Sequence, residues 1–405
     1  MRQVFLDHQS ATPVLPEVLT AMLPWFSAEF GAPASFHRRG LAARRALELA
    51  RGQFAQFLNA PSPEDIIFTS GGTEAANLAV LGTAYAQEKR GRHIVASATE
   101  HLSVLRTIAF LEGRGWTCTR VGVDRRGWVD PAAVRAALTA DTVLICVHHA
   151  NHELGAVQPI SEIGQLAQDR GLTFFVDATA TGGWLPIDVQ AMGASLLSLS
   201  PHRLYGPKGV GVLYRHRQAR LVAVQHGGSQ EGGRRAGTEN VPAIVGAGQA
   251  AQLALGELPE RGRLTAALQA RLWAGIGAQI PHVQLLGPDL GPARLSTNVN
   301  LAIEFVEGEG LVLRLDLQGV AAATGPACLS RALKVSHVLQ AIGLDHGLAQ
   351  GNLVFSLGRD NTEADIDYTI AVLTETVGRL RSLSPLWEEF QRGTLVSAIT
   401  SRAGE

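Results

Sequence analysis

Apolar runs of strand length alternate with helical periodicity over residues 15–255, and no other feature restricts the fold as strongly. Amphipathic stretches such as 41–51 separate the runs. The runs are 65–69, 93–97, 142–147, 173–177, 196–200 and 211–214. This alternation predicts an α/β fold, with a mostly parallel sheet covered by helices on both faces. Ligands of such folds bind beyond the carboxyl ends of the strands.

The pattern changes near residue 256. A helical stretch is followed by strand-like runs near 295–305 and 320–324, and helical periodicity dominates from Ser336 onward. We therefore expect a large domain of residues 15–255. A smaller α+β domain is expected to combine residues 1–14 with 256–405 and to carry Cys328.

Composition excludes several classes of function. The 405 residues are 46% hydrophobic, with Lys+Arg 35 against Asp+Glu 36 and a net charge of -1. With a net charge this close to zero, the protein as a whole does not attract nucleic acid or an anionic membrane electrostatically. The first residues enter an apolar strand without the pattern of a signal peptide, and no apolar run reaches membrane-spanning length. We expect a soluble, cytoplasmic protein that binds neither membrane nor nucleic acid.

Cysteine and lysine are scarce. Cys118, Cys146 and Cys328 are an odd set without metal-type spacing, so a disulfide framework is not expected. Cys146 lies inside an apolar run and is predicted to be buried. Lysine occurs only at 89, 208 and 334, so arginine supplies nearly all of the positive charge.

Polar residues follow three of the predicted strands. Ser70-Gly71-Gly72-Thr73-Glu74 follows one strand and begins a helix, a turn whose backbone N–H groups suit an anion. Asp177 ends another strand, where its carboxylate would hold a pyridine nitrogen protonated or cap a helix. His101 follows a third, as a ring-stacking or proton-transfer group or as an ordinary surface histidine. Position alone does not separate these alternatives.

The order of these segments along the chain is more specific. It continues with 151–160, Val176-Asp177-Ala178-Thr179, 200–209, 227–240, 324–328 and 355–367. The whole series resembles the cysteine desulfurases of the class V aminotransferase family, in the branch that serves iron–sulfur cluster assembly. The resemblance implies a pyridoxal-phosphate-dependent transferase fold of type I.

The resemblance also implies roles for individual residues. Gly72, Thr73, Ser200, His202 and Thr238 would bind the cofactor phosphate, with Thr238 contributed across a homodimer. His101 would stack on the ring, Asn151 would lie beside it, and Asp177 would pair with its nitrogen. Cys328 would carry sulfur as a persulfide. The region from Arg379 would dock a scaffold or sulfur-acceptor protein.

Four departures from the family pattern fall at the centre of this chemistry. Arg203 stands where the family has the lysine that attaches the cofactor, and a guanidinium is a poor nucleophile that stays protonated. Val354 replaces the arginine that binds the substrate carboxylate. Ala180 replaces a glutamine that contacts the ring hydroxyl, and Pro326 replaces a serine near Cys328. Arg203 would instead fill the pocket, pair with Asp177, or hold the phosphate of a noncovalently bound cofactor.

These departures predict that desulfurase activity has been lost. Our leading hypothesis is a homodimeric platform for sulfur transfer or cluster assembly. In it, Cys328 accepts sulfur or ligates an iron–sulfur cluster shared with a partner. One alternative is a pyridoxal phosphate enzyme with altered chemistry, and another is a functional cysteine desulfurase that converts cysteine to alanine and persulfide.

Overall fold

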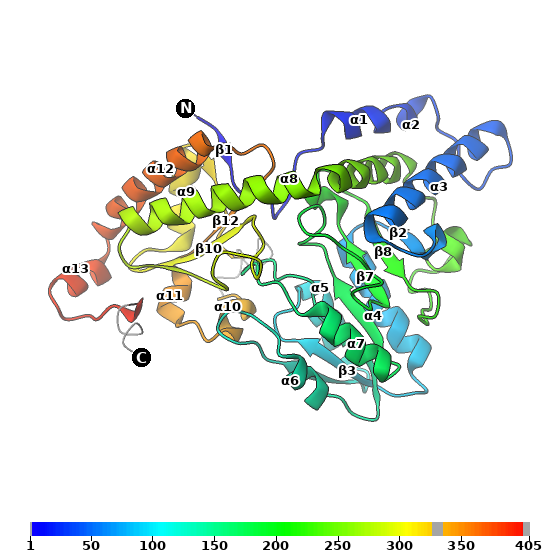
Figure 1. Ribbon diagram of the computed structural model, residues 1–405, viewed down its shortest axis with the longest axis horizontal. Coiled ribbons are helices and arrows are strands. Elements are labelled where there is room, and N and C mark those ends of the chain that lie inside the picture. Colours follow the sequence, from blue (N-terminus) through cyan, green and yellow to red (C-terminus); the bar gives the residue numbers. More distant parts are fainter. Residues whose placement is uncertain (1, 326–334, 400–405) are drawn as a thin grey trace.

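A seven-stranded sheet forms the centre of the larger of two layered bodies in the computed structural model, which describes residues 2–325 and 335–399 (Figure 1). The strand order is β2-β8-β7-β6-β5-β3-β4. Only β8 runs against the others, pairing antiparallel with both β2 and β7. The strands are β2 (Ile66–Thr69), β3 (His93–Ser97), β4 (Thr117–Val121), β5 (Thr142–Cys146), β6 (Thr173–Asp177), β7 (Leu196–Leu199) and β8 (Gly211–Arg215). The predicted mostly parallel α/β sheet is confirmed.

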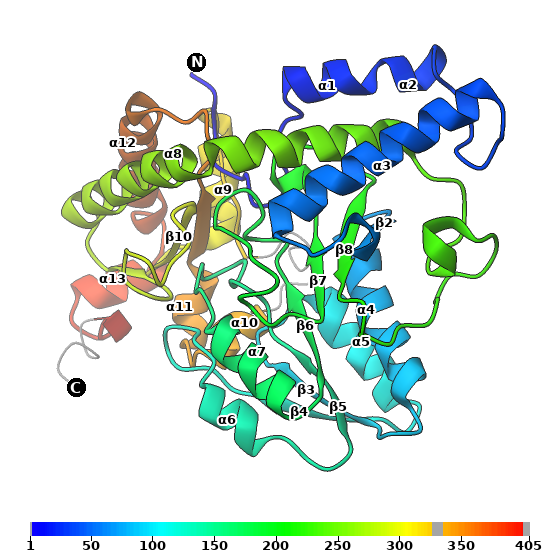
Figure 2. The same cartoon turned by 45° about the vertical axis from the view of Figure 1, so that its right-hand side comes forward.

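Helices cover both faces of this sheet because its inner strands are apolar on both sides. In β6, Phe174 and Val176 point into one core while Phe175 points into the other. Figure 2 shows α4 and α5 on one side and α7 on the other. Cys146, at the end of β5, is fully buried as predicted. The helices around this sheet are α1 (Pro16–Met22), α2 (Pro24–Ser27), α3 (Arg38–Leu58), α4 (Gly72–Gln87), α5 (Leu102–Glu112), α6 (Pro131–Ala136) and α7 (Ile160–Asp169).

The smaller body is α+β, as expected. An antiparallel sheet of order β12-β10-β9 packs with α9, α12 and part of α8 around its own apolar core. The chain's first strand joins this body, because β1 pairs with β11. The elements are β1 (Val4–Phe5), β9 (Val283–Leu285), β10 (Asn298–Ile303), β11 (Val320–Ala321), β12 (Asn352–Ser356), α9 (Gly308–Leu317), α10 (His337–Ala341), α11 (His346–Gln350), α12 (Glu363–Arg381) and α13 (Pro385–Gln391).

One long helix, α8 (Val241–Gln279), runs along both bodies (Figure 1). Its first half contributes Ala247 and Ala251 to the larger core, and its second half contributes Leu268 and Leu272 to the smaller one. The predicted domain boundary between residues 255 and 256 falls inside this helix, and the division into 15–255 and 1–14 with 256–405 stays a prediction.

Three strands, β4, β9 and β12, were not predicted. β4 lies at the edge of the large sheet, where most of its side chains are wholly or partly exposed, so it lacks an apolar run. β12 lies within the region expected to be helical after Ser336, although its five residues are all buried. Among the described residues, no helix combines the length and apolar character needed to cross a membrane.

Candidate functional site

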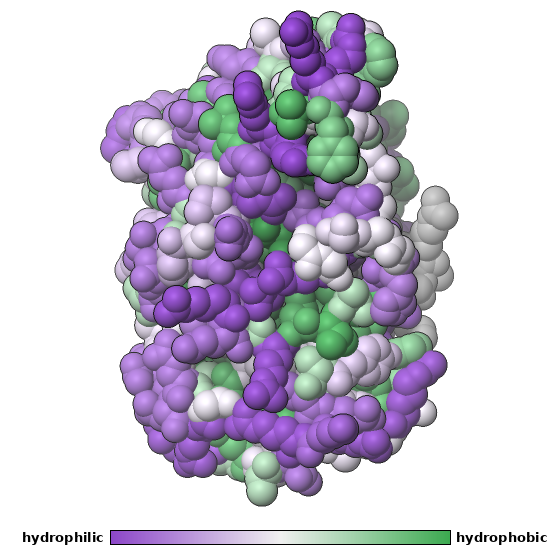
Figure 3. Space-filling model, turned by 90° about the vertical axis from the view of Figure 1, so that its right-hand side faces the viewer, coloured by the Kyte–Doolittle hydropathy of each residue, from purple (hydrophilic) through white to green (hydrophobic). Residues whose placement is uncertain are grey.

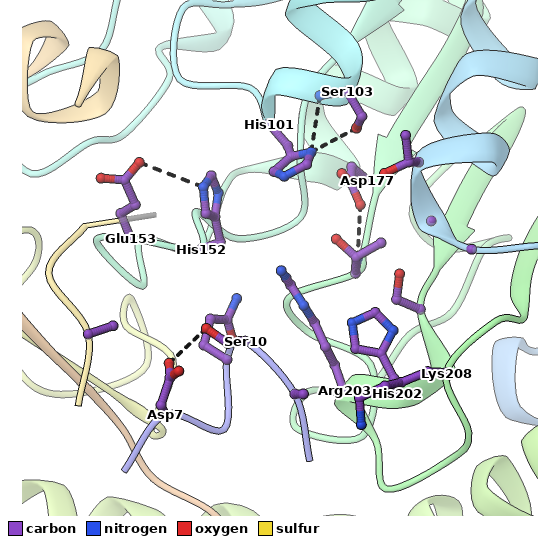
Figure 4. A pocket seen from close by; sticks show the side chains of 18 of the residues that line it. Asp7, Ser10, His101, Ser103, His152, Glu153, Asp177, His202, Arg203 and Lys208 are labelled. Carbon is purple, nitrogen blue, oxygen red and sulfur yellow. Dashed lines mark hydrogen bonds and ion pairs between the residues drawn. The ribbon is translucent and has the colours of Figure 1, made fainter. Parts of the chain in front are cut away.

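The carboxyl ends of the strands meet at a cavity of about 550 Å³ between the two bodies (Figure 4). The residues that follow β2, β3, β5, β6 and β7 all reach it, since these strands point the same way. Residues from the N-terminal segment and from β12 close the other side. The lining comprises Asp7, Gln9, Ser10, Ala11, Ser70, Gly71, Gly72, Thr73, Glu74, His101, Ser103, His152, Glu153, Asp177, Thr179, Ser200, His202, Arg203, Lys208, Gly209, Ala323, Gly325 and Val354.

One end of the cavity has the features of an anion site. The 16-residue helix α4 begins there at Gly72, so its first N–H groups and the positive end of its dipole face the cavity. A side chain at Gly72 would collide with Ser200 Oγ and the Thr179 methyl group, so only glycine permits this close approach. Thr73, Ser200 and His202 also line the cavity, and their role in binding a phosphate stays a prediction.

Glu74 in the first turn of α4 does not cancel the positive charge of this end. Its carboxylate accepts hydrogen bonds from the Ser70 N–H (2.7 Å) and from Arg235 Nε (2.9 Å). These contacts hold the pKa of Glu74 below its usual value although burial opposes them. The acid is thus already paired, and the backbone donors stay available to a phosphate.

Asp177 is fixed as a buried hydrogen-bond acceptor at the end of β6. Its Oδ1 accepts the Ser198 hydroxyl (3.1 Å) and the Thr179 N–H (2.9 Å). The side chain lines the cavity and is 5% exposed. A carboxylate held in this way suits a protonated pyridine nitrogen.

His101 and His152 form one wall of the cavity (Figure 4). His101 Nδ1 accepts the Ser103 N–H at 3.1 Å, which leaves the ring proton of the neutral form on Nε2. The two imidazoles meet edge to face with centroids 5.3 Å apart. Burial, the largest cause, and the charge of Arg203 lower the pKa of both rings, although Asp177 opposes this at His101. Both imidazoles are therefore neutral near neutral pH.

Arg203 projects from the turn after β7 into the cavity, toward His152 and Asp177 (Figure 4). Its charge acts on His202 as well: burial, then Arg203 and Lys208, lower the pKa of His202 to about 4. Val354, 5% exposed, lines the cavity from β12 without a charge. The cavity thus fits a phosphate and a pyridine nitrogen, but residue 203 offers no amine that would attach a cofactor.

Several predicted residues lie elsewhere. The Asn151 amide is buried in a turn, donating to the Thr99 carbonyl and accepting the Glu153 and Leu154 N–H groups, and it does not line the cavity. Ala180 packs against Ala150 and Leu295. Thr238 is exposed and does not line the cavity of this chain. The roles predicted for Asn151 and Thr238 stay predictions.

Cys328 and Pro326 lie outside the described residues, so the predicted persulfide and cluster roles are without a structural description. Within 2–325 and 335–399, no group of three histidine, cysteine or acidic side chains is arranged to hold a metal ion.

Sequence reasoning missed Glu153, which is 2% exposed. Its Oε1 accepts the Ser336 hydroxyl at 2.8 Å and lies 3.6 Å from His152 Nε2. Burial raises the pKa of Glu153 to about 7. The available signal was a run of polar residues, Asn151 to Glu153, a few residues after the buried strand β5.

Comparison with known proteins agrees with this architecture. A family model described as Aminotransferase class-V matches residues 4–369. Cysteine desulfurase IscS of Clostridium botulinum is 44% identical over 391 residues, 96% of this chain and 98% of that protein. The protein of the same name from Methanosarcina thermophila is 45% identical over 385 residues, 95% of this chain and 94% of its own.

Solved structures agree as well. A NifS-like protein superposes with a TM-score of 0.87 at 31% identity, covering 93% of this chain and 100% of its own. SspA in complex with cysteine gives a TM-score of 0.78 at 34% identity, over 89% of this chain and 100% of its own. The chain therefore belongs to the class V aminotransferase family, in the group formed by the cysteine desulfurases.

Proposed function

We propose that this protein binds pyridoxal phosphate noncovalently and acts in the transfer of sulfur derived from cysteine. The family implies the cofactor. The observation that carries the proposal is one cavity that combines a glycine-limited helix N-terminus with a buried, hydrogen-bonded Asp177. A cavity that no longer bound the cofactor would not require either feature.

The chain's own residues would act as follows. The first N–H groups of α4, with Ser200 and His202, would hold the phosphate. Asp177 would keep the pyridine nitrogen protonated, and neutral His101 would stack on the ring and exchange a proton through Nε2. Bound pyridoxal phosphate supplies an electron sink for charge on a substrate carbon. Arg203 would not attach the cofactor, so the phosphate contacts would provide most of the retention.

Cysteine desulfuration is the first candidate activity. The relatives that match over nearly the whole chain are named cysteine desulfurases. Their names favour a functional desulfurase over the predicted loss of activity, and nothing in the comparisons indicates such a loss.

A noncatalytic platform is the second candidate, and the observation that favours it is the pair Arg203 and Val354 inside the cavity. In this function Cys328 would accept persulfide or share an iron–sulfur cluster with a partner, and the region from Arg379 would dock a scaffold protein. Co-purification with a scaffold that survives both Cys328→Ser and truncation before Ser384 would contradict it.

A homodimer is also part of the proposal. Large apolar side chains are exposed on α1–α3 and the loops between them: Leu19, Leu23, Phe26, Phe30, Phe36, Leu41 and Leu49. Figure 3 shows hydrophobic side chains among hydrophilic ones at the upper end of one face, where Figure 1 places these helices. A patch of this kind suits association with a second copy, whose exposed Thr238 would reach the phosphate end.

The test combines a visible absorption spectrum with borohydride and cysteine turnover. Wild-type protein incubated with pyridoxal phosphate should show a cofactor band that gel filtration removes and that borohydride does not fix to the protein. Arg203→Lys should retain the band and gain a covalent pyridoxyl mass at residue 203. No band in either protein would contradict cofactor binding, whereas fixation to Lys208 in wild type would contradict noncovalent binding.

Turnover separates the two candidate activities. Alanine and sulfide formed from cysteine by wild-type protein would establish the desulfurase. Turnover that appears only in Arg203→Lys would favour the platform, and would show that Val354 still permits substrate binding.

A further inference from the structure

His152 is a histidine of the cavity wall that lies beside a carboxyl group. Its Nε2 is 3.6 Å from Oε1 of Glu153, which also lines the cavity. Figure 4 shows the two side chains next to each other, with His101 on the same wall. Within the described residues, the other two lining histidines, His101 and His202, pair with no carboxylate. Of the three rings, His152 is thus the one with a proton acceptor beside it.

The Glu153 carboxyl group is fixed in place but only half satisfied. Its Oε1 accepts the Ser336 hydroxyl at 2.8 Å, and that hydroxyl is itself oriented by the Val338 N–H at 3.1 Å. Its Oε2 is buried and has no hydrogen-bond partner among the described residues. A buried carboxylate with one unsatisfied oxygen is costly, so burial raises the pKa of Glu153 to about 7. Near neutral pH this group can therefore either hold or release a proton.

His152 is in surroundings that disfavour its charged form. Burial, the largest cause, lowers the pKa of its imidazole well below the usual value. The groups that face it and add to this effect are His101 at the start of α5, Arg203 after β7, His148 after β5 and His337 in α10. Its Nδ1 has no hydrogen-bond partner among the described residues and is not enclosed, so it stays available to a ligand. Such a ring can accept a proton on one nitrogen only while it releases the proton of the other.

We propose that His152 and Glu153 form a proton relay for the ligand of the cavity, with His152 in contact with the ligand and Glu153 as the positioning residue that holds the proton. This inference rests on the proposed binding of pyridoxal phosphate and adds the groups that move protons there. A movement of roughly 0.5 Å would bring Nε2 and Oε1 within hydrogen-bond distance.

The relay needs no oxidant or reductant. A substrate C–H bond breaks and leaves its electron pair with the substrate, while an N–H bond forms at His152 Nδ1. The Nε2–H bond of the same ring breaks, and an O–H bond forms at Glu153. The imidazole is neutral before and after, and the return of the proton reverses each step.

The first test is a pH titration of the protein without cofactor, followed by NMR of ¹³C-labelled histidine. The His152 signal is the one that His152→Asn lacks. In wild type it should shift with a midpoint near pH 7 as Glu153 ionises, and in Glu153→Gln this shift should be absent. Ser336→Ala should move the midpoint to higher pH, because the Ser336 hydroxyl favours the ionised carboxyl group. His37, the exposed N-cap of α3, should titrate identically in all of these proteins.

The second test follows the exchange of the α-hydrogen of alanine for deuterium in the presence of pyridoxal phosphate. The wild-type rate should rise with pH through the Glu153 midpoint. His152→Asn should lower the rate roughly 100-fold or more, the contribution expected of a positioned acid–base group, and Glu153→Gln should remove the pH dependence. Glu260→Gln is the matched control, because it makes the same change at an exposed position and should leave the rate unchanged.

Each outcome bears on the relay. A His152 signal that titrates in the same way in wild type and Glu153→Gln would overturn it. So would an exchange rate no faster than with free pyridoxal phosphate, or one that His152→Asn leaves unchanged. Failure of wild type to bind pyridoxal phosphate would overturn the proposed function and the relay with it, whereas binding without coupling between His152 and Glu153 would overturn the relay alone.

Discussion

The Glu153 carboxyl group is buried between the two bodies of the molecule. Its backbone carbonyl accepts the side-chain amides of Asn298 and Asn300 from β10, and its carboxyl group accepts Ser336 at the start of α10. Because burial raises its pKa from 4.5 to about 7, the folded state takes up a proton that the unfolded chain releases. The resulting stabilisation is complete below the unfolded pKa and is lost as pH rises through the folded one.

Glu153→Gln should therefore remove a pH dependence rather than simply lower stability. The amide stays neutral and still accepts the Ser336 hydroxyl. The free energy of unfolding of the variant, minus that of wild type, should rise from about pH 5 to about pH 8 by on the order of 3 kcal/mol at most. Urea unfolding at the two pH values measures the difference.

Glu260→Gln provides the control, since Glu260 is exposed and Arg263 holds its pKa below the usual value. The difference in free energy of unfolding between Glu260→Gln and wild type should be the same at both pH values. If the difference in free energy of unfolding between Glu153→Gln and wild type were also independent of pH, the Glu153 carboxyl group would not titrate between the two pH values.

At the scale of elements, the start of α4 depends on two adjacent glycines that differ in their surroundings. A Cβ on Gly72 would collide with Ser200 and Thr179, whereas a Cβ on Gly71 meets no atom within 4 Å. Gly71 is also extended, with φ 165, a conformation open to any residue.

Gly72→Ala should lower the free energy of unfolding by about 1–3 kcal/mol through overpacking. It should also weaken pyridoxal phosphate binding, because Ser200 must move away from the phosphate end. Gly71→Ala should leave the melting temperature nearly unchanged. Thermal unfolding and calorimetric titration of the two variants check this; equal effects would indicate that the contact with Ser200 does not limit the site.

Elements with continuous apolar runs could be predicted from the sequence, and elements without them could not. β5 and β6 are buried on both faces, so their sequences are apolar throughout. β4 is an edge strand that is mostly exposed, and its Thr117-Cys118-Thr119-Arg120 segment carries no such signal. β12 has only three apolar residues, Leu353 to Phe355, between polar ends, in a region where helical patterns dominate.

For the whole molecule, local motifs identified several residues of the cavity but not its full lining. Asp177 ends a strand, and Gly72 and Arg203 follow strands, so the sheet topology brings them together. Asp7 and Val354 reach the cavity only because β1 and β12 belong to the smaller body and that body packs against the larger one. Such contacts depend on how two cores pack, which periodicity within one segment does not reveal.

The exposed apolar patch on α1–α3 gives a prediction for the assembly. Phe26→Glu with Phe36→Glu should convert the proposed dimer to monomers, because two charges would enter an apolar interface; these side chains are 62% and 90% exposed in the single chain. Light scattering after gel filtration measures the mass.

Leu313→Glu is the matched control, because Leu313 is 68% exposed on α9 in the smaller body, outside the patch. It should leave the mass unchanged. A monomeric wild type, or a double variant that stays dimeric, would contradict the proposed interface.

The walls of the cavity come from distant parts of the chain, so they become available at different times during synthesis. Its wall includes Asp7, from the beginning of the chain, and Val354, which lies near the end. At common rates of translation these two residues leave the ribosome roughly 20–70 s apart. A nascent chain therefore presents the proposed phosphate end of the cavity, formed by residues 70–74 and 200–203, well before the far wall exists. A cofactor captured at that stage would be enclosed only as the last strand, β12, pairs with β10.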